Sequence, residues 1–327
     1  SKRNCSLTEI EEMNAFLHDR FGGPEVQRVG RVPIPGPPGE GEVLVKVHAA
    51  SLNPVDYKQR EGGLRWLLEY GWPQLFGFDF SGELVALGKG VSERVPKLAV
   101  GDEVFGQVNG LRKCTAAEFC IVAADVCAKK PENVTHVEAA SVPLVAMTVM
   151  QSFHCCFRTD TDAPGPTATG PRVLILRGSG GVGTMAIQLS KQMFGASYVA
   201  VTASSSKEKE LLALGADRVI DYKTQQFDRE LASSDSSQLF DVIIDGTGEI
   251  DKCVGLVRPQ GGIVSLLASP DAEALSKWIA DNEATPRGYG KARAWLPGII
   301  RSSVGGWLVD TATGAKRLQR QCKVRGA

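Results

Sequence analysis

The stretch RGSGGVG, residues 177–183, contains the residues whose types and spacing are most directly tied to chemistry. Gly178, Gly180 and Gly183 fit the pattern G-x-G-x-x-G, after the apolar run RVLIL (172–176) and before a helical pattern. In that context the glycines let the backbone approach a pyrophosphate, and the free N–H groups at the helix start meet its charge. We therefore predict that a dinucleotide is bound by Gly178, Ser179, Gly180, Gly181, Val182 and Gly183.

The residues after the next apolar strand indicate which nicotinamide coenzyme is bound. An NAD site normally places Asp or Glu about 20 residues past the glycines, where it accepts a hydrogen bond from the ribose 2′-hydroxyl. This chain has no acid between Gly183 and Glu208, and offers Ser204, Ser206 and Lys207 instead. Two charge-assisted bonds to a 2′-phosphate, at roughly 1.5–3 kcal/mol each, would favour NADPH by about 100-fold or more. The alternative is that Lys207 is a solvated lysine at a helix start.

Strand and helix patterns alternate around this motif. The expected strands are RVLIL (172–176), YVAVTA (198–203), DRVID (217–221), DVIID (241–245) and GIVSLLA (262–268), with helices at 184–194, 207–214 and 250–257. Strands this apolar are typical of a parallel sheet covered on both faces, the doubly wound α/β fold. The first helix is expected to turn Val182, Met185 (or Ala186), Leu189 and Met193 inward.

The first third of the chain has a different pattern. In EVLVKVHAA (42–50) three valines alternate with other residues, and FSGELVALG (80–88), GDEVFGQV (101–108) and AEFCIVAA (117–124) indicate further short strands. These runs predict a compact, mainly antiparallel β domain. A mostly apolar helix follows at 136–156, which Pro143 is expected to bend or divide. Another helix is expected after Ala268, with Ser269 as its N-cap.

The composition excludes several classes of function. Across 327 residues, 37 basic and 37 acidic side chains cancel, which argues against a nucleic-acid-binding protein. No apolar run approaches the ~20 residues that cross a bilayer. Eight scattered cysteines without a CxxC pair are typical of reduced thiols, so we expect a cytoplasmic protein. Because the sequence begins with Ser1, an organellar import signal could precede it.

Taken in order, the motifs resemble the medium-chain dehydrogenase/reductase superfamily, in its zinc-free quinone oxidoreductase and alkenal (enone) reductase branch. The resemblance extends from about Met13 to about Ala268 and includes VKVHAASLNPVDYKQREG, GFDFSGELVALG, AASVPLVAMTVMQSF and GADRVIDYKTQQFD. It implies a GroES-like catalytic domain over 1–145 and a Rossmann NADPH-binding domain over 146–268. The segment 269–327 would be an incomplete return to the catalytic domain.

The resemblance also assigns roles to single residues. Lys207 and Tyr222, with Ser204 or Ser206 nearby, match the contacts to the coenzyme 2′-phosphate, and Thr148 matches a position beside the nicotinamide. It also implies three catalytic residues. Asn53 matches the branch's active-site asparagine, with Asp56 at the usual spacing. Lys58 matches a contact to the substrate carbonyl or the coenzyme ribose, and Tyr57 beside it is the third candidate.

Each catalytic residue also has a structural alternative. Asn53 precedes Pro54 and could simply start a turn, Lys58 could be a surface lysine, and Tyr57 could serve packing. Trp66, Tyr70 and Trp72 could cap a flat substrate or pack at an edge.

A zinc site is not expected from these residues. Zinc-dependent relatives carry Cys near the position of Asn53 and Gly-His-Glu where this chain has Gly77-Phe78-Asp79. Cys114, Cys120 and Cys127 are also too widely spaced for a structural zinc site. We expect GFDFSG to be a turn with packing glycines.

The expected function is an NADPH-dependent, zinc-independent transfer of hydride to a quinone or to the C=C bond of an α,β-unsaturated carbonyl. Asn53, Lys58 and the Tyr57 hydroxyl are the candidate donors to the charge that develops on the carbonyl oxygen. The partner is a small-molecule substrate, and a homodimer is possible. The alternatives are a 2-enoyl thioester reductase and a non-catalytic NADPH-binding partner or sensor.

Overall fold

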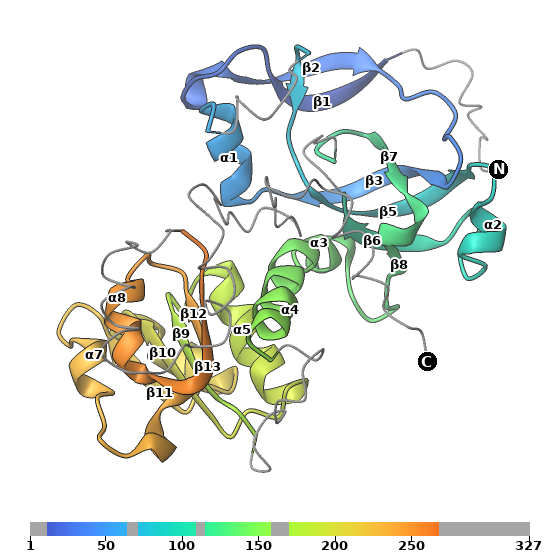
Figure 1. Ribbon diagram of the computed structural model, residues 1–327. Coiled ribbons are helices and arrows are strands. Elements are labelled where there is room, and N and C mark those ends of the chain that lie inside the picture. Colours follow the sequence, from blue (N-terminus) through green and yellow to red (C-terminus); the bar gives the residue numbers. More distant parts are fainter. Residues whose placement is uncertain (1–11, 64–70, 109–114, 158–169, 268–327) are drawn as a thin grey trace, which may run out of the picture. The chain divides into compact units, whose positions relative to one another are not determined.

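The computed structural model describes residues 12–63, 71–108, 115–157 and 170–267 of the chain (Figure 1). The chain divides into two compact units between Leu144 and Val145. The helix expected from Ser269, and the rest of the segment 269–327, lie outside the described residues.

The first unit contains a five-stranded antiparallel sheet in the order β7-β3-β5-β6-β8. Its strands are β3 (Glu42–Ser51), β5 (Asp79–Leu87), β6 (Glu103–Gln107), β7 (Phe119–Ala123) and β8 (Cys127–Lys129). The antiparallel GroES-like domain predicted from the alternating valines is therefore confirmed.

A second, three-stranded sheet in this unit was not predicted. Its order is β2-β1-β4, built from β1 (Glu12–His18), β2 (Gln27–Pro33) and β4 (Gln74–Leu75). In β1 the residues Met13, Ala15 and Leu17 are buried, and they pack in one cluster with Leu44 of β3 and Phe119 of β7. Short helices complete the described part of the unit: η2 (Pro24–Val26), α1 (Pro54–Arg60), α2 (Val91–Arg94), η3 (Ala124–Val126) and α3 (His136–Ala140).

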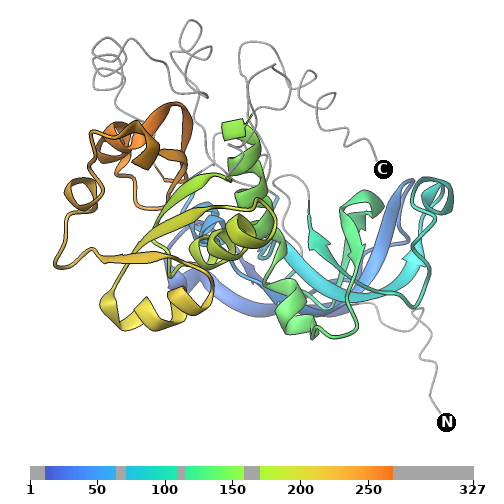
Figure 2. The same ribbon diagram turned by 90° about the horizontal axis from the view of Figure 1, so that it is seen from below.

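The second unit contains a parallel sheet in the order β11-β10-β9-β12-β13, whose strands lie side by side in Figures 1 and 2. Its strands are β9 (Arg172–Leu176), β10 (Tyr198–Ala203), β11 (Arg218–Asp221), β12 (Phe240–Asp245) and β13 (Val257–Ser265). The order runs outward from β9 in both directions, which is the doubly wound arrangement. The prediction of a Rossmann-type parallel sheet is confirmed.

Apolar side chains cover both faces of this sheet, as the continuous apolar runs indicated. In β9, Val173 and Ile175 belong to one buried cluster, whereas Leu174 and Leu176 belong to another. The helices around the sheet are α5 (Gly181–Gln192), η4 (Ser205–Lys207), α6 (Glu208–Ala213), α7 (Phe227–Glu230), η5 (Ser236–Gln238), α8 (Ile250–Cys253) and η6 (Val254–Leu256).

Pro143 divides the long apolar segment rather than bending it. Helix α3 ends at Ala140, and α4 (Pro143–Phe157) begins at the proline itself. Proline lacks a backbone N–H and is therefore tolerated best at the first helical position. In α4, Val149, Phe153 and Cys156 pack into the same cluster as Val173 and Ile175.

The inward face of α5 differs from the expected one. The helix begins at Gly181 rather than Thr184, and its buried residues are Gly183, Ala186, Ile187 and Ser190. Met193 is 56% exposed, so its predicted inward position was wrong. Val182, Met185 and Leu189 pack at the margin of the core. Ala186, the predicted alternative to Met185, is buried as expected.

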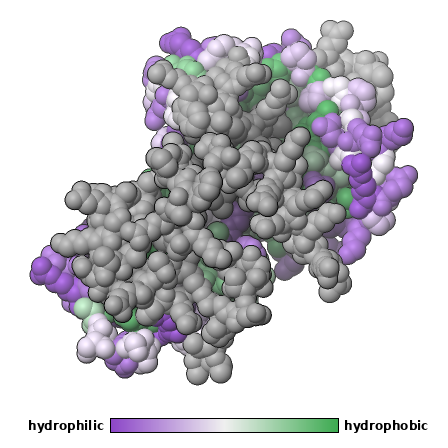
Figure 3. Space-filling view, in the orientation of Figure 1, coloured by the Kyte–Doolittle hydropathy of each residue, from purple (hydrophilic) through white to green (hydrophobic). Residues whose placement is uncertain are grey.

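Among the described residues, no helix combines the length and the apolar character needed to cross a membrane. Where Figure 3 leaves the surface coloured, hydrophilic residues (purple) are prominent, with smaller hydrophobic (green) patches.

Candidate functional site

The glycine turn is anchored to the end of β10 by two hydrogen bonds, one to the backbone and one to the side chain of Thr202. Gly178 N donates to Thr202 O at 2.8 Å, and Arg177 N donates to Thr202 Oγ1 at 3.0 Å. Gly180 N donates back to Arg177 O at 3.0 Å, and Gly180 is the N-cap of α5. The turn therefore ends where the free N–H groups of a twelve-residue helix begin.

A side chain on Gly178 or Gly183 would crowd the turn. A Cβ on Gly183 would lie 2.4 Å from Arg177 O and 2.6 Å from Gly178 O. A Cβ on Gly178 would lie 2.8 Å from Cβ of Val201. Ser179 and Gly181 are exposed, so the turn presents backbone to solvent. This geometry fits a coenzyme diphosphate, because the third glycine permits close packing of helix on strand and the others leave room for the ligand.

The four residues predicted to contact a 2′-phosphate lie together at the carboxyl ends of β10 and β11. Ser204 directly follows β10, and its Oγ is 3.0 Å from Oγ of Ser206. Tyr222 directly follows β11, donates its N–H to Ala203 O at 3.3 Å and is 62% exposed. Lys207 is joined to Ser204 through a backbone hydrogen bond of 2.9 Å.

Two carboxylates near this group, those of Glu210 and Asp221, were not predicted from the sequence. The Lys207 ammonium is 3.0 Å from the Glu210 carboxylate, one helical turn away. The Lys223 N–H and the Ser205 hydroxyl and N–H lower the pKa of Asp221. An exposed ion pair contributes only about 0–1 kcal/mol, so Lys207 can exchange Glu210 for a phosphate at little cost. Asp221 is at the end of β11, so it is not among the residues after β10 from which the coenzyme preference was predicted.

Thr148 lies on α4, the helix that reaches the start of α5. Val145 Cγ1, one turn before Thr148, lies 3.4 Å from the place where a Cβ on Gly181 would be. Thr148 is 8% exposed, and its carbonyl oxygen accepts a hydrogen bond from Ser152 Oγ at 2.8 Å. Thr148 thus lies one helical turn beyond Val145, the residue of α4 that is beside Gly181.

In the first unit, the predicted catalytic residues lie at the start of α1. Asn53 is the N-cap, Pro54 is the first helical residue, and the Asn53 N–H donates to Asp56 Oδ2 at 2.8 Å. This contact belongs to a capping box, which explains the spacing of Asn53 and Asp56. The other Asp56 oxygen, Oδ1, accepts a hydrogen bond from Gly77 N at 2.9 Å.

The Asn53 side chain is held by a buried carboxylate. Its Nδ2 donates to Asp79 Oδ2 at 2.8 Å and lies 3.4 Å from Ser51 Oγ. Asp79 Oδ2 also accepts from Ser51 Oγ at 2.8 Å, and Asp79 Oδ1 accepts from Leu144 N, in the first turn of α4, at 2.9 Å. Because its amide donates to Asp79, Asn53 is oriented by this network rather than aimed outward.

Asp79 is 1% exposed, and its burial raises its pKa to about 6 although Ser51, Asn53 and Leu144 donate hydrogen bonds to it. The charge of Asp56 raises the pKa further. The expectation that GFDFSG is a turn with packing glycines was therefore incomplete. Gly77 does have a left-handed φ of 96°, but Asp79 begins β5 and connects three segments distant in sequence.

Tyr57 and Lys58 lie on the other face of α1. Val55, Asp56, Gln59 and Arg60 are buried, whereas Tyr57 is 45% exposed and Lys58 is exposed. The structure therefore brings Asn53 into a buried network and leaves Tyr57 and Lys58 accessible. Of the aromatic residues considered as a substrate cap, Trp72 packs edge-on against His18 and Phe21. Trp66 and Tyr70 lie outside the described residues.

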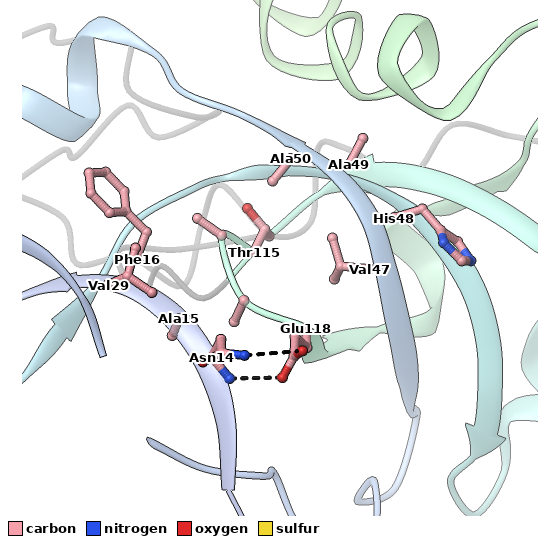
Figure 4. A pocket seen from close by; sticks show the side chains of 12 residues that line it. Asn14, Ala15, Phe16, Val29, Val47, His48, Ala49, Ala50, Thr115 and Glu118 are labelled. Carbon is pink, nitrogen blue, oxygen red and sulfur yellow. Dashed lines mark hydrogen bonds between the residues drawn. The ribbon is translucent and has the colours of Figure 1, made fainter. Parts of the chain in front are cut away.

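A hollow of about 330 Å³ lies in the first unit, between β1, β3 and the segment 115–118 (Figure 4). Phe16, Val29 and Val47 supply apolar walls, and Asn14 donates two hydrogen bonds to Glu118 at its margin. None of the predicted site residues lines it, so we assign it no part in the site.

In the described part of the chain, no three His, Cys, Asp or Glu side chains gather closely enough to hold a metal ion. A structural or catalytic zinc needs three or four such ligands. The described residues therefore do not fit zinc.

Comparisons with known proteins agree with this architecture. Residues 39–135 match the family model "Alcohol dehydrogenase GroES-like domain", and residues 181–280 match "Zinc-binding dehydrogenase". The chain is 33% identical to 2-methylene-furan-3-one reductase of Solanum lycopersicum over 81% of its length, and 34% identical to the chloroplastic NADPH-dependent alkenal/one oxidoreductase of Arabidopsis thaliana over 78%. It spans 65% and 63% of the length of these two relatives.

Among solved structures, the quinone oxidoreductase from Coxiella burnetii is similar with a TM-score of 0.65 and 32% identity, covering 83% of this chain and 80% of that one. The chain belongs to the medium-chain dehydrogenase/reductase superfamily, in its zinc-free quinone oxidoreductase and enone reductase branch.

Proposed function

We propose that the protein is an NADPH-dependent, zinc-independent oxidoreductase that reduces a quinone or the C=C bond of an α,β-unsaturated carbonyl compound. The observation that carries this proposal is the group formed by Ser204, Ser206, Lys207 and Tyr222 at the carboxyl end of β10, next to the strand that leads into the glycine turn. The names of the tomato and Arabidopsis relatives support the same chemistry.

The second unit would hold the coenzyme by its two negatively charged groups, the diphosphate and the 2′-phosphate. The backbone of Gly178–Gly183 and the start of α5 receive the diphosphate, and the group around Lys207 receives the 2′-phosphate. When bound, NADPH supplies hydride. Thr148 remains the predicted neighbour of the nicotinamide. NADPH is preferred over NADH because hydroxyls and a cation follow β10 where an NAD site would place an acid.

The first unit would supply the groups that stabilise the substrate's carbonyl oxygen as it gains negative charge. Lys58 and Tyr57 are accessible donors, and such donors act most strongly when held in place before the reaction. Asn53 has a different part. Its amide is bonded to Asp79, so it fixes the start of α1 and thereby the positions of Tyr57 and Lys58.

The domain bounds 1–145, 146–268 and 269–327, the homodimer and the cytoplasmic location stay predictions. Among the described residues, Cys127, Cys156 and Cys253 are free thiols, which supports a reducing compartment. The chloroplastic name of the Arabidopsis relative keeps organellar location open as an alternative.

The test is a substrate panel with NADPH, comprising a benzoquinone, an enone, an alkenal and a crotonyl thioester. Consumption of NADPH with the quinone or the unsaturated carbonyls supports the proposal. Faster consumption with the thioester would instead identify a 2-enoyl thioester reductase. Binding of NADPH without consumption by any of the four would identify a sensor or partner protein.

A further inference from the structure

Arg177, between β9 and the glycine turn, has an unusual backbone conformation. Its φ is 66°, and it is the one non-glycine residue with a positive φ in the described part of the chain. A side chain in this left-handed region meets its own backbone, which is why glycine normally occupies such positions. Strained residues of this kind concentrate at binding and catalytic sites, where the surrounding structure holds them.

The surrounding contacts fix this conformation. Arg177 N donates to Thr202 Oγ1 at 3.0 Å, and Arg177 O accepts from Gly180 N at 3.0 Å. The geometry of the glycine turn therefore requires a left-handed residue at this position. Glycine would satisfy that requirement without strain, so the arginine side chain must be explained by what it does.

The Arg177 side chain lies along the turn toward β12. Its Cγ and Nε are 3.6 and 3.7 Å from where a Cβ on Gly180 would be. Its Cβ and Cδ are 3.4 and 3.9 Å from where a Cβ on Gly246 would be, and Gly246 directly follows β12. In the sheet, β12 is the neighbour of β9 on the side opposite β10. The side chain thus runs past the start of α5, on the side away from Ser204 and Lys207.

The guanidinium of Arg177 is exposed and forms no hydrogen bond or ion pair with any described residue. The nearby carboxylate of Asp245, at the end of β12, is already occupied. It accepts hydrogen bonds from Thr247 N at 2.8 Å, Thr247 Oγ1 at 2.9 Å, Gly248 N at 2.8 Å and Ser265 Oγ at 3.0 Å. A guanidinium beside a helix N-terminus presents five donors and a full positive charge to a phosphate.

We propose that Arg177 binds the diphosphate bridge of the coenzyme. This inference rests on the proposed function, and it adds a charged contact to the glycine turn that the G-x-G-x-x-G pattern does not contain. The diphosphate is common to NADPH and NADH. Arg177 therefore strengthens the binding of both coenzymes equally, whereas Lys207 distinguishes between them.

The experiment measures binding by calorimetry, with four probes: NADPH, NADH, ADP-ribose and adenosine 2′-monophosphate. Two variants, Arg177→Gly and Arg177→Asn, remove the charge but keep residues that tolerate the left-handed region. We expect each variant to weaken the binding of NADPH, NADH and ADP-ribose by the same factor, about tenfold. The affinity for adenosine 2′-monophosphate, which has no diphosphate, stays unchanged.

Thermal unfolding separates a lost contact from a damaged fold. The melting temperature of Arg177→Gly should equal or exceed that of the parent chain, since glycine removes the backbone strain. Lys207→Ala is the contrasting variant, which should weaken adenosine 2′-monophosphate and NADPH but not NADH or ADP-ribose.

Unchanged binding of all four probes by both Arg177 variants would overturn the inference while leaving the proposed function intact, provided that the parent chain binds NADPH. Selective loss of adenosine 2′-monophosphate would also overturn it, because Arg177 would then serve the 2′-phosphate. A parent chain that binds neither NADPH nor NADH would overturn the proposed function together with the inference.

Discussion

The side-chain amide of Asn53 donates a hydrogen bond to the buried carboxylate of Asp79, with Nδ2 2.8 Å from Oδ2. The same carboxylate accepts hydrogen bonds from Ser51 Oγ and from Leu144 N. One acidic side chain thus connects the end of β3, the start of α1 and the start of α4. In our proposal, this relationship makes Asn53 a residue that positions α1.

Replacing Asp79 should change how stability depends on pH. Burial raises the folded-state pKa of Asp79 to about 6 from its ordinary value of 3.8, so the folded protein binds more protons here than the unfolded chain does. The contribution of Asp79 to stability is full below its pKa in the unfolded chain, and it is lost as the pH rises through its pKa in the folded protein. Between about pH 5 and about pH 7 the parent chain loses about 1 kcal/mol from this group.

Asp79→Asn cannot titrate at this position. The free energy of unfolding of the parent chain minus that of the variant should therefore fall by about 1 kcal/mol from about pH 5 to about pH 7. Urea unfolding at several pH values measures this difference. If the value for the parent chain minus that for the variant stays constant or rises with pH, Asp79 does not titrate as its burial implies.

Lys207→Ala should weaken NADPH binding by about 10- to 100-fold, because one charge-assisted contact to the 2′-phosphate contributes about 1.5–3 kcal/mol. The affinity for NADH should not change. Quenching of protein fluorescence by each coenzyme gives both dissociation constants. Lys209→Ala, which removes another exposed lysine two residues away, is the matched control and should leave both constants unchanged. Equal weakening of NADPH and NADH by Lys207→Ala would refute the assignment.

Lys58→Ala should lower kcat by about 10- to 100-fold at saturating NADPH, because the developing charge on the substrate oxygen loses a donor. The dissociation constant for NADPH should stay the same, since the coenzyme phosphates are held by residues of the second unit. Lys97→Ala, at another exposed lysine of the first unit, is the control. If kcat is unchanged in Lys58→Ala, this lysine has no part in the reaction and Tyr57 becomes the remaining accessible donor.

Gly183→Ala should destabilise the fold by about 1–3 kcal/mol and abolish measurable coenzyme binding. Its new Cβ would lie 2.4 Å from Arg177 O, so the turn must open. Gly255→Ala is the matched control, since nothing lies within 4 Å of its added Cβ. Denaturant unfolding and coenzyme titration measure the two effects. Coenzyme binding by Gly183→Ala at the parental affinity would show that the close packing of this turn is not needed.

The sequence predicted the second unit well because its signals are local. Continuous apolar runs indicated a sheet buried on both faces, and the glycine spacing between a strand and a helix identified the turn. The inward face of α5 was harder to predict, because two of the residues buried on it are small and one of these is polar. Ala186 and Ser190 are buried there, whereas the larger Met193 is exposed.

The features that the sequence did not show depend on contacts between distant segments. Asp79 is a single acid in the apolar stretch FGFDF, and only the fold brings Ser51, Asn53 and Leu144 to it. Burial of such an acid is a usable signal, because a charged group in an apolar run must find partners. Asp221 reaches Ser205 from the neighbouring strand, and the backbone angle of Arg177 has no counterpart in residue type.

The most direct test of the central claim is the nicotinamide absorbance of NADPH, followed with the protein and an enone or a benzoquinone, with and without a metal chelator. The proposal predicts a protein-dependent loss of absorbance that the chelator does not slow. The loss should be much slower when NADH replaces NADPH at the same low concentration. No consumption of NADPH with any of these acceptors, or consumption that the chelator abolishes, would contradict it.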